Sequence, residues 1–247
     1  MKTYVFYTPS YEVLLKEWFL PSANNYFDLA IRKGDEPSGT SADYKLHGWT
    51  EITKQKTEFI IEAIRDNWGK LFVFSDPDIL FFQDPKKALF KNYVNQDILF
   101  QRNSAGGALC SGFFLCKGSH KTLRLWKLIS KLVGRHNRDD QDALNCLLFN
   151  KYAYVDNILN SLSWYRGRAF MVGLSEIGMN ICGLRWGYLT LEFANFGTLR
   201  MREWFPGESF PVQKGTIMFH ANWTTGLNNK IALLKFVKDY VEKNRGI

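Results

Sequence analysis

The segment Leu71-Phe72-Val73-Phe74-Ser75-Asp76-Pro77-Asp78 decides the fold class of this 247-residue chain. Its four successive apolar residues are typical of a strand buried on both faces, as strands of a parallel or mixed sheet are. Two carboxylates follow directly, and in open α/β sheets ligands bind beyond the carboxyl ends of the strands. The segment therefore predicts an α/β protein with a polar site at the end of this strand.

Regular patterns continue on both sides of that strand. Apolar residues at helical spacing predict a helix from about Thr50 to Trp68, which Gly69 ends. The turn at Thr8-Pro9-Ser10 is expected to begin another helix, which Pro21 stops. Strands are predicted at 4–7, 27–31, 97–100, 112–116 and 216–219, and further helices at 119–132, 141–149 and 230–242. The aromatic, glycine-rich segment 152–210 lacks a clear period, so its elements are not predicted.

Composition indicates one folded domain. Of the residues, 46% are hydrophobic and only 7 are proline, which excludes disordered and collagen-like chains. No internal repeat or linker divides the chain. The cysteines form no CxxC or zinc-binding pattern, and we interpret them as reduced and mostly buried: Cys110, Cys116, Cys146 and Cys182.

The net charge of +8 favours an anionic partner, which could be nucleic acid, a phosphate-bearing small molecule or an acidic membrane surface. The lysines and arginines are dispersed and form no basic-aromatic motif, which argues against nucleic acid. The first apolar run is shorter than the roughly 7–15 residues of a signal-peptide core, and no run reaches the roughly 18 residues of a membrane helix. We expect a soluble cytoplasmic protein, with peripheral membrane contact of the basic C-terminal helix left open.

Asp76-Pro77-Asp78 is the strongest chemical signal in the chain. Its two carboxylates repel each other unless a positive charge lies between them, and hard oxygen ligands suit Mg²⁺ or Mn²⁺. Pro77 fixes its φ angle and stiffens the turn that carries both carboxylates. The alternative is a polar turn that only ends the strand, because Asp and Pro are common in turns.

Two further motifs carry groups that suit a metal and a phosphate. Asp140-Gln141-Asp142 begins a predicted helix, where Asp140 is a natural N-cap and Asp142 favours the helix dipole, so a structural role is the alternative. His220 ends the last predicted strand and opens a polar loop that includes Gly226, after which Lys230 begins a helix. Imidazole with two carboxylates is a competent ligand set for Mn²⁺, and the loop offers hydrogen-bond donors to phosphates.

In this order, the motifs resemble those of retaining GT-A glycosyltransferases, especially the bacterial lipopolysaccharide galactosyltransferase and glycogenin group, and those of the related nucleotide-diphospho-sugar transferase family. The resemblance spans about residues 1–235, through segments 70–85, 111–114, 140–145 and the loop at Phe219-His220. It implies a GT-A (Rossmann-like) α/β fold: a mixed, mainly parallel central sheet flanked by helices, in a single domain, 1–247. Residues 1 to about 120 would form the nucleotide-binding half and about 121–247 the acceptor-side half.

The resemblance also implies roles for particular residues. Asp76 and Asp78 would hold Mn²⁺, or Mg²⁺, against the diphosphate of a nucleotide-sugar, with His220 as the third protein ligand. Asp140 would accept hydrogen bonds from the donor sugar, and Gln141 would lie near its anomeric carbon. Asp142 completes the catalytic candidates, and the donor-binding candidates are Thr8, Ser10, Lys56, Asp76, Ser111, Gly112, Asn222, Gly226 and Lys230. One departure is that the HxxGxxKPW ending of glycogenin-type relatives is absent, and His220-Ala221-Asn222-Trp223 stands in its place.

The activity that the resemblance implies is metal-dependent transfer of a hexose or pentose from a nucleotide-sugar, expected to be UDP-linked, to a saccharide or glycan acceptor. We expect retention of anomeric configuration, because a front-face reaction needs no strong base and Gln141 suits it better than a catalytic carboxylate would. The alternative is a catalytically inactive carbohydrate- or nucleotide-binding module, or a partner of another transferase. An aspartyl phosphotransferase is disfavoured because apolar residues, rather than Ser or Thr, follow Asp78.

Large aromatic residues gather in the segment whose elements are not predicted. Flat rings stack on sugars, so an acceptor cleft is one interpretation, but we interpret most of these rings as core residues. They are Trp164, Tyr165, Trp186, Tyr188, Phe193, Phe196 and Trp204.

Overall fold

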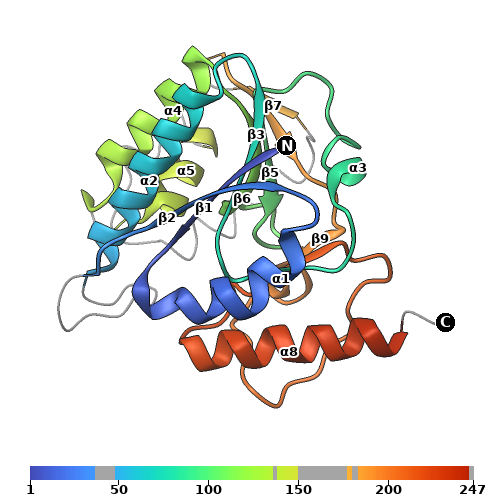
Figure 1. Cartoon of the computed structure of the whole chain (residues 1–247). Helices are drawn as coiled ribbons and strands as arrows, with labels where there is room; N and C mark the ends of the chain where they lie inside the picture. The colour runs from blue at the N-terminus through green and yellow to red at the C-terminus, as the bar shows by residue number, and fades with distance from the viewer. Residues whose placement is uncertain (37–47, 136–137, 150–176, 180–182, 245–247) are drawn as a thin grey trace.

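A seven-stranded mixed sheet forms the centre of the computed structural model, which describes residues 1–36, 48–135, 138–149, 177–179 and 183–244 (Figure 1). The strand order is β2-β1-β3-β6-β5-β8-β7. Strand pairing makes β2, β1, β3, β5 and β8 parallel to one another, while β6 and β7 run the opposite way. The mixed, mainly parallel sheet expected from the sequence is confirmed. Its strands are β1 (Lys2–Tyr7), β2 (Asp28–Lys33), β3 (Leu71–Ser75), β5 (Ile98–Arg102), β6 (Leu109–Lys117), β7 (Ile177–Met179) and β8 (Arg185–Tyr188).

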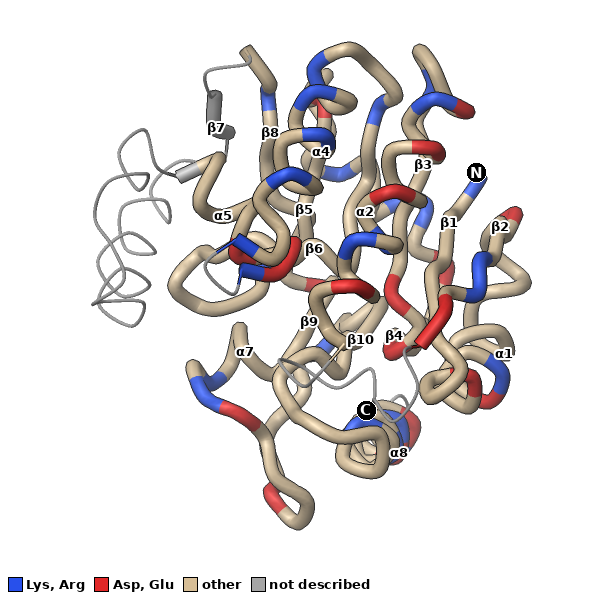
Figure 2. Tube along the Cα trace, turned by 90° about the vertical axis from the view of Figure 1, so that its left-hand side faces the viewer, with Lys and Arg blue, Asp and Glu red and all other residues tan. Residues whose placement is uncertain are grey.

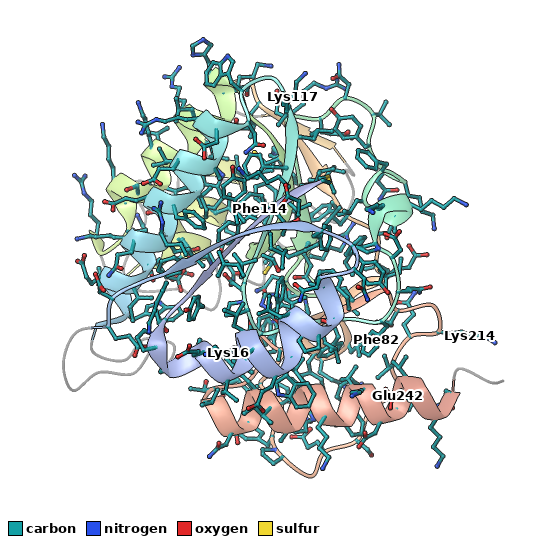
Figure 3. The ribbon with its side chains drawn as sticks, in the orientation of Figure 1. Lys16, Phe82, Phe114, Lys117, Lys214 and Glu242 are labelled. Atoms are coloured by element: carbon teal, nitrogen blue, oxygen red, sulfur yellow. The ribbon has the colours of Figure 1, made fainter. Side chains whose placement is uncertain are left out.

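Three helices cover one face of this sheet, at the left in Figure 1: α2 (Trp49–Asp66), α4 (His120–Leu132) and α5 (Asp140–Phe149). Their apolar sides and the sheet enclose a buried core. Phe114 lies at its centre (Figure 3), stacked between Phe74 and Trp126 at ring-centroid distances of 5.3 and 5.1 Å. This packing explains why the apolar run of β3 is continuous, because both faces of the strand are covered.

The other face of the sheet carries the N-terminal helical segment, formed by η1 (Pro9–Tyr11), η2 (Leu14–Phe19) and α1 (Leu20–Ala23). Beside it lies a small sheet, β4-β10-β9, made of β4 (Ile79–Phe81), β10 (Met218–His220) and β9 (Phe193–Asn195). The long C-terminal helix α8 (Leu227–Asn244) packs against this small sheet through Leu233, Leu234 and Val237. Two short helices complete the described elements, α3 (Lys86–Leu89) and α7 (Phe196–Leu199).

The strands and long helices predicted from the sequence are present, and Ser119 caps α4 through its hydroxyl, as expected. The predicted stop at Pro21 is wrong, since η2 continues directly into α1 as far as Ala23. Proline is tolerated there because it lies in the first turn of α1, where an amide hydrogen is dispensable. Strand β4 was not predicted, because a three-residue strand gives no period to detect. Basic residues are spread over helices and loops throughout the described chain (Figure 2), as the sequence suggests.

Candidate active site

The turn that follows β3 is held between the two sheets. The amide of Asp76 donates to the carbonyl of Gly112 on β6 over 2.7 Å, which continues the pairing of β3 with β6. After Pro77 and Asp78, the chain enters β4, which pairs antiparallel with β10 so that Ile79 lies opposite His220. This strand pair brings the second aspartate of the motif beside a histidine far away in the sequence.

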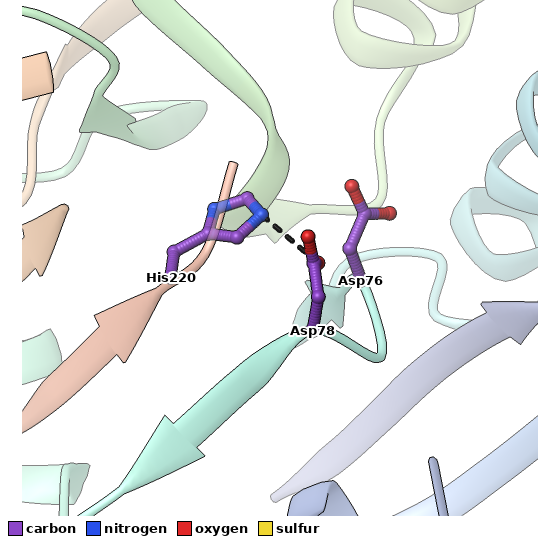
Figure 4. A group of neighbouring side chains, drawn as sticks. All are labelled: Asp76, Asp78 and His220. Atoms are coloured by element: carbon purple, nitrogen blue, oxygen red, sulfur yellow. Dashed lines mark ion pairs between the residues drawn. The ribbon is translucent and has the colours of Figure 1, made fainter. Parts of the chain in front are cut away.

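Asp76, Asp78 and His220 offer ligand atoms that all lie within 4.8 Å of one another (Figure 4). Nε2 of His220 is 3.1 Å from Oδ1 of Asp78, and both of these side chains are buried. Gly112 forms the floor of the cluster, because a Cβ there would overlap the Asp76 carboxylate and the His220 ring. The small residue leaves room for both ligands, and two carboxylates with one imidazole suit Mn²⁺ or Mg²⁺. The residues thus fit a divalent cation.

Two lysines balance the carboxylates. Nζ of Lys230 lies 2.6 Å from Oδ2 of Asp78 and also donates to the carbonyl of Ala221 over 2.9 Å. Nζ of Lys56 bridges two carboxylates, at 2.9 Å from Asp76 and 3.1 Å from Asp140. When the His220 ring is neutral, three ionised carboxylates facing two ammonium groups leave one negative charge, which favours a further cation at this place.

These contacts shift the pKa values of the site. Burial alone would lower the pKa of Lys56, but the carboxylates of Asp140 and Asp76 outweigh it and raise the pKa well above its usual value. Burial likewise opposes ionisation of Asp78, yet Lys230 and His220 lower its pKa below the usual range. Desolvation raises the pKa of Asp76. The positive charge of Lys56 opposes this shift, and the negative charge of Asp78 adds to it.

The histidine carries a proton in the metal-free site. Burial would lower the pKa of His220, but its contact with Asp78, supported by the Cys110 sulfur, raises the pKa to about 10. A cation bound to Nε2 would have to replace that proton, because only the neutral ring offers a lone pair.

The second nitrogen of the same ring is held by a residue that sequence reasoning missed. Nδ1 of His220 lies 2.9 Å from Oε1 of Gln101 and 3.6 Å from the Cys110 sulfur. The Gln101 amide nitrogen donates to the carbonyls of Phe193 and Ala194, each over 3.1 Å, so its oxygen must face the ring. Nδ1 therefore donates to Gln101, and a neutral ring presents its lone pair at Nε2. No motif marks Gln101, which lies within β5 after three ordinary apolar residues.

The Asp140-Gln141-Asp142 motif begins α5, as predicted, but the N-cap is Asp139. Its carboxylate accepts from the Asp142 amide over 2.7 Å and its carbonyl accepts from Ala143. The N-cap assigned to Asp140 is thus wrong by one residue. Because Asp139 caps the helix, the Asp140 side chain is available to Lys56. The side-chain oxygen of Gln141 accepts from the amide of Ser111 at 3.4 Å, which places both near the beginning of β6.

The remaining donor-binding candidates lie around this centre. Thr8 is buried after β1, with its hydroxyl 3.4 Å from that of Ser10, and Ser10 in turn donates to the Glu36 carboxylate from its amide and hydroxyl. Asn222 donates to Asn103 over 2.8 Å. Gly226 adopts a φ of +90° and opens α8, where its carbonyl accepts from the Lys230 amide. Their contact with a donor stays a prediction.

Of the aromatic residues singled out in the sequence, those that the structure describes are buried, in agreement with a core role: Trp186, Tyr188, Phe193, Phe196 and Trp204. Trp164 and Tyr165 lie outside the described residues. Among the helices that are described, none combines the length and apolar character needed to cross a bilayer.

Comparison with known proteins agrees with this fold. The model of the nucleotide-diphospho-sugar transferase family matches residues 21–234. The protein is a glycosyltransferase. The chain belongs to the nucleotide-diphospho-sugar transferase family. A search of curated proteins finds no match.

Two solved glycosyltransferase structures are similar to this chain. One is a glycosyltransferase involved in the glycosylation of the major capsid of PBCV-1, with 10% identity and a TM-score of 0.51, and the match covers 95% of this chain and 98% of that one. Another is the glycosyltransferase GlyE of Streptococcus pneumoniae TIGR4, with 12% identity and a TM-score of 0.49, covering 98% of this chain and 64% of that one. The first likeness supports the GT-A fold expected from the sequence.

Proposed function

We propose that this glycosyltransferase moves a hexose or pentose from a UDP-sugar to a saccharide or glycan acceptor, with Mn²⁺ as its cofactor and Mg²⁺ as the alternative. The observation that carries the proposal is the convergence of Asp76, Asp78 and His220 beyond the carboxyl end of β3. A divalent cation bound by these residues would supply positive charge to the diphosphate leaving group.

The residues around the three metal ligands would bind the sugar, the diphosphate and the base of the donor. Lys56 holds Asp76 and Asp140 in fixed positions, so that the Asp140 carboxylate can accept hydrogen bonds from donor-sugar hydroxyls. Lys230 lies in the first turn of α8, next to Asp78, and offers an ammonium group to the diphosphate. Thr8 and Ser10 lie after β1, where they would contact the base. The net charge of +8 helps to attract a dianionic donor.

Retention of anomeric configuration is the outcome we propose, and the contacts of Asp140 support it. The Asp140 carboxylate is already engaged by Nζ of Lys56 at 3.1 Å. An inverting reaction would need a carboxylate free to deprotonate the acceptor. In a front-face reaction, the departing phosphate takes that proton, and the neutral amide of Gln141 sits beside the anomeric carbon. Gln141→Ala should leave donor binding unchanged and lower kcat by on the order of 100-fold.

Thermal unfolding with Mn²⁺ and a panel of UDP-, GDP- and CMP-sugars tests the donor site, because a ligand that binds only the native state raises its apparent stability. We expect a Mn²⁺-dependent shift with UDP-sugars that Asp78→Ala abolishes and the exposed-site control Asp239→Ala retains. The ¹H coupling constant of the product's anomeric proton then tests retention.

A catalytically inactive binding module or partner protein is the alternative. It would still show the Mn²⁺ and UDP-sugar shift, but it would not hydrolyse the donor when acceptor is absent. Intact transfer by Asp78→Ala would contradict the assignment of the metal ligands.

A further inference from the structure

A pocket of about 710 Å³ lies apart from the metal ligands, between the chain that follows α3 and the ends of β5 and β8. Its size is in the range of pockets that hold small organic ligands. Its walls mix hydroxyl, amide, guanidinium and aromatic groups, among them those of Asn92, Arg102, Ser104, Tyr188, Thr190 and Gln213. Such a mixture matches the many hydroxyl groups and flat faces of a saccharide.

The hydroxyl group of Ser104 is the first sign that this pocket is built for a ligand. Ser104 is fully buried, and its Oγ has no hydrogen-bond partner within the described parts of the chain. A buried polar atom without a partner is costly and uncommon in native proteins. Ser104 lines the pocket, so a small outward movement of the atoms that cover it would let a hydroxyl of a bound ligand provide the missing partner.

The second sign is a fixed pair of flat side chains. The guanidinium of Arg102 lies 3.8 Å from the ring centroid of Tyr188. The Tyr188 hydroxyl donates to the carbonyl of Gly107, which keeps the ring in place. Lys91, by contrast, is already paired with Glu192 at 3.2 Å, whereas no ion pair of Arg102 is found among the described residues. Arg102 therefore presents unused donors on a rigid support, which suits sugar hydroxyls or a uronic acid carboxylate.

One short segment separates the pocket from the candidate active site. Gln101 contacts His220, and Asn103 accepts from Asn222 over 2.8 Å and, through its carbonyl, from the indole of Trp223 over 2.6 Å. Arg102 and Ser104, the residues next to these in the sequence, line the pocket. The segment thus has the candidate active site on one side and the pocket on the other.

We propose that this pocket binds a saccharide unit of the glycan acceptor that is remote from the reacting hydroxyl group. The assignment of the bound saccharide to the acceptor rests on the proposed transferase function. Saccharide binding by the pocket does not depend on that function and can be measured separately. A long acceptor bound there would contact Arg102 and Ser104, on the side of the segment opposite to the one that contacts His220.

The test applies the full chain, without metal or donor, to an array of neutral and uronic-acid glycans, and measures each glycan that binds by saturation-transfer NMR. We expect Ser104→Ala and Arg102→Met each to weaken binding about tenfold or more, a loss of about 1.4 kcal/mol. Thr3→Val is the matched control, because Thr3 also has a buried hydroxyl without a partner in the described chain but lies on β1, outside the pocket.

Three readouts keep the outcomes separate. Ser104→Ala should be at least as stable as the parent chain, because it removes an unpaired polar group, so weaker binding cannot be blamed on unfolding. The Mn²⁺ and UDP-sugar thermal shift should be unchanged in both variants. Absence of binding to every glycan, or binding that neither variant weakens, would overturn the pocket proposal. Glycan binding without any donor shift would overturn the transferase proposal and leave the pocket as a saccharide site.

Discussion

Oε1 of Gln101 lies 2.9 Å from Nδ1 of His220, while the nitrogen of the same amide is anchored on the carbonyls of Phe193 and Ala194. The anchoring fixes which end of the amide faces the ring. It thereby fixes which ring nitrogen of His220 faces Asp78. Gln101, which is not a metal ligand itself, therefore sets the orientation of the histidine ligand.

Gln101→Leu should weaken Mn²⁺ binding about 10- to 100-fold, because the loss of a partner to a metal-binding histidine costs that much. The free Mn²⁺ signal in electron paramagnetic resonance measures the affinity directly. Gln96→Leu is the control, since Gln96 is equally buried but bonds to Val94 and Asn92. Equal Mn²⁺ affinities in both variants would show that Gln101 does not position the ring.

Lys230→Met should separate two effects of one ammonium group. The metal-free variant should lose about 3 kcal/mol of unfolding free energy, because Asp78 keeps its buried charge without its closest partner. Added Mn²⁺ should stabilise the variant more than the parent, since a competing positive charge is gone, whereas UDP should bind less tightly. Differential scanning fluorimetry with Mn²⁺ alone and with Mn²⁺ and UDP distinguishes these results. Lys235→Met, on the exposed side of the same helix, should match the parent in every condition.

Gly112→Ala should remove Mn²⁺ binding while leaving the chain folded. The added methyl group would occupy the space of the Asp76 carboxylate and the His220 ring, so those two side chains must move. Isothermal titration with Mn²⁺ and far-UV circular dichroism together check this outcome.

Gly215→Ala serves as the comparison for Gly112→Ala. Gly215 has a φ of +85° and open space around it, so alanine there strains the backbone by roughly 1–2 kcal/mol without touching the site. Loss of Mn²⁺ binding in Gly215→Ala as well would mean that general destabilisation, rather than crowding, explains the result.

The raised pKa of His220 predicts how stability depends on pH when metal is absent. The folded protein keeps the His220 proton up to a pKa of about 10, whereas the unfolded chain releases it near 6.5. The stabilisation is therefore complete below pH 6.5, falls as pH rises, and is lost above about 10. Urea unfolding in the presence of a chelator between pH 6.5 and 10 should show this decline. His220→Gln should flatten it, and an unchanged slope in that variant would assign the decline to other groups.

The sequence predicts the elements whose signals are local. The apolar run of β3, the periodic helix α2 and the cap at Ser119 each depend on residues that are neighbours in the chain, and the structure confirms them. The ligand set was predicted from its motifs, although Asp76 follows β3 of the large sheet and His220 lies on β10 of the small one.

What the sequence could not provide depends on contacts between distant residues. Gln101 reaches His220 only because β9 lies beside β5 and supplies the anchoring carbonyls. The bridge from Lys56 to Asp140 depends on α2 and α5 packing side by side, and the cap of α5 moves to Asp139 so that Asp140 can join it. Side-chain partners of this kind follow from the tertiary arrangement, not from a motif.

The pairing of Ile79 with His220 ties two parts of the candidate site together across most of the chain. During synthesis, both aspartates leave the ribosome long before the histidine does. A nascent or shortened chain that lacks β10 therefore carries the carboxylates without their third ligand or the strand that positions Asp78. The capacity to hold a cation thus arises only after β10 has been synthesised, and it reports that β10 has paired with β4.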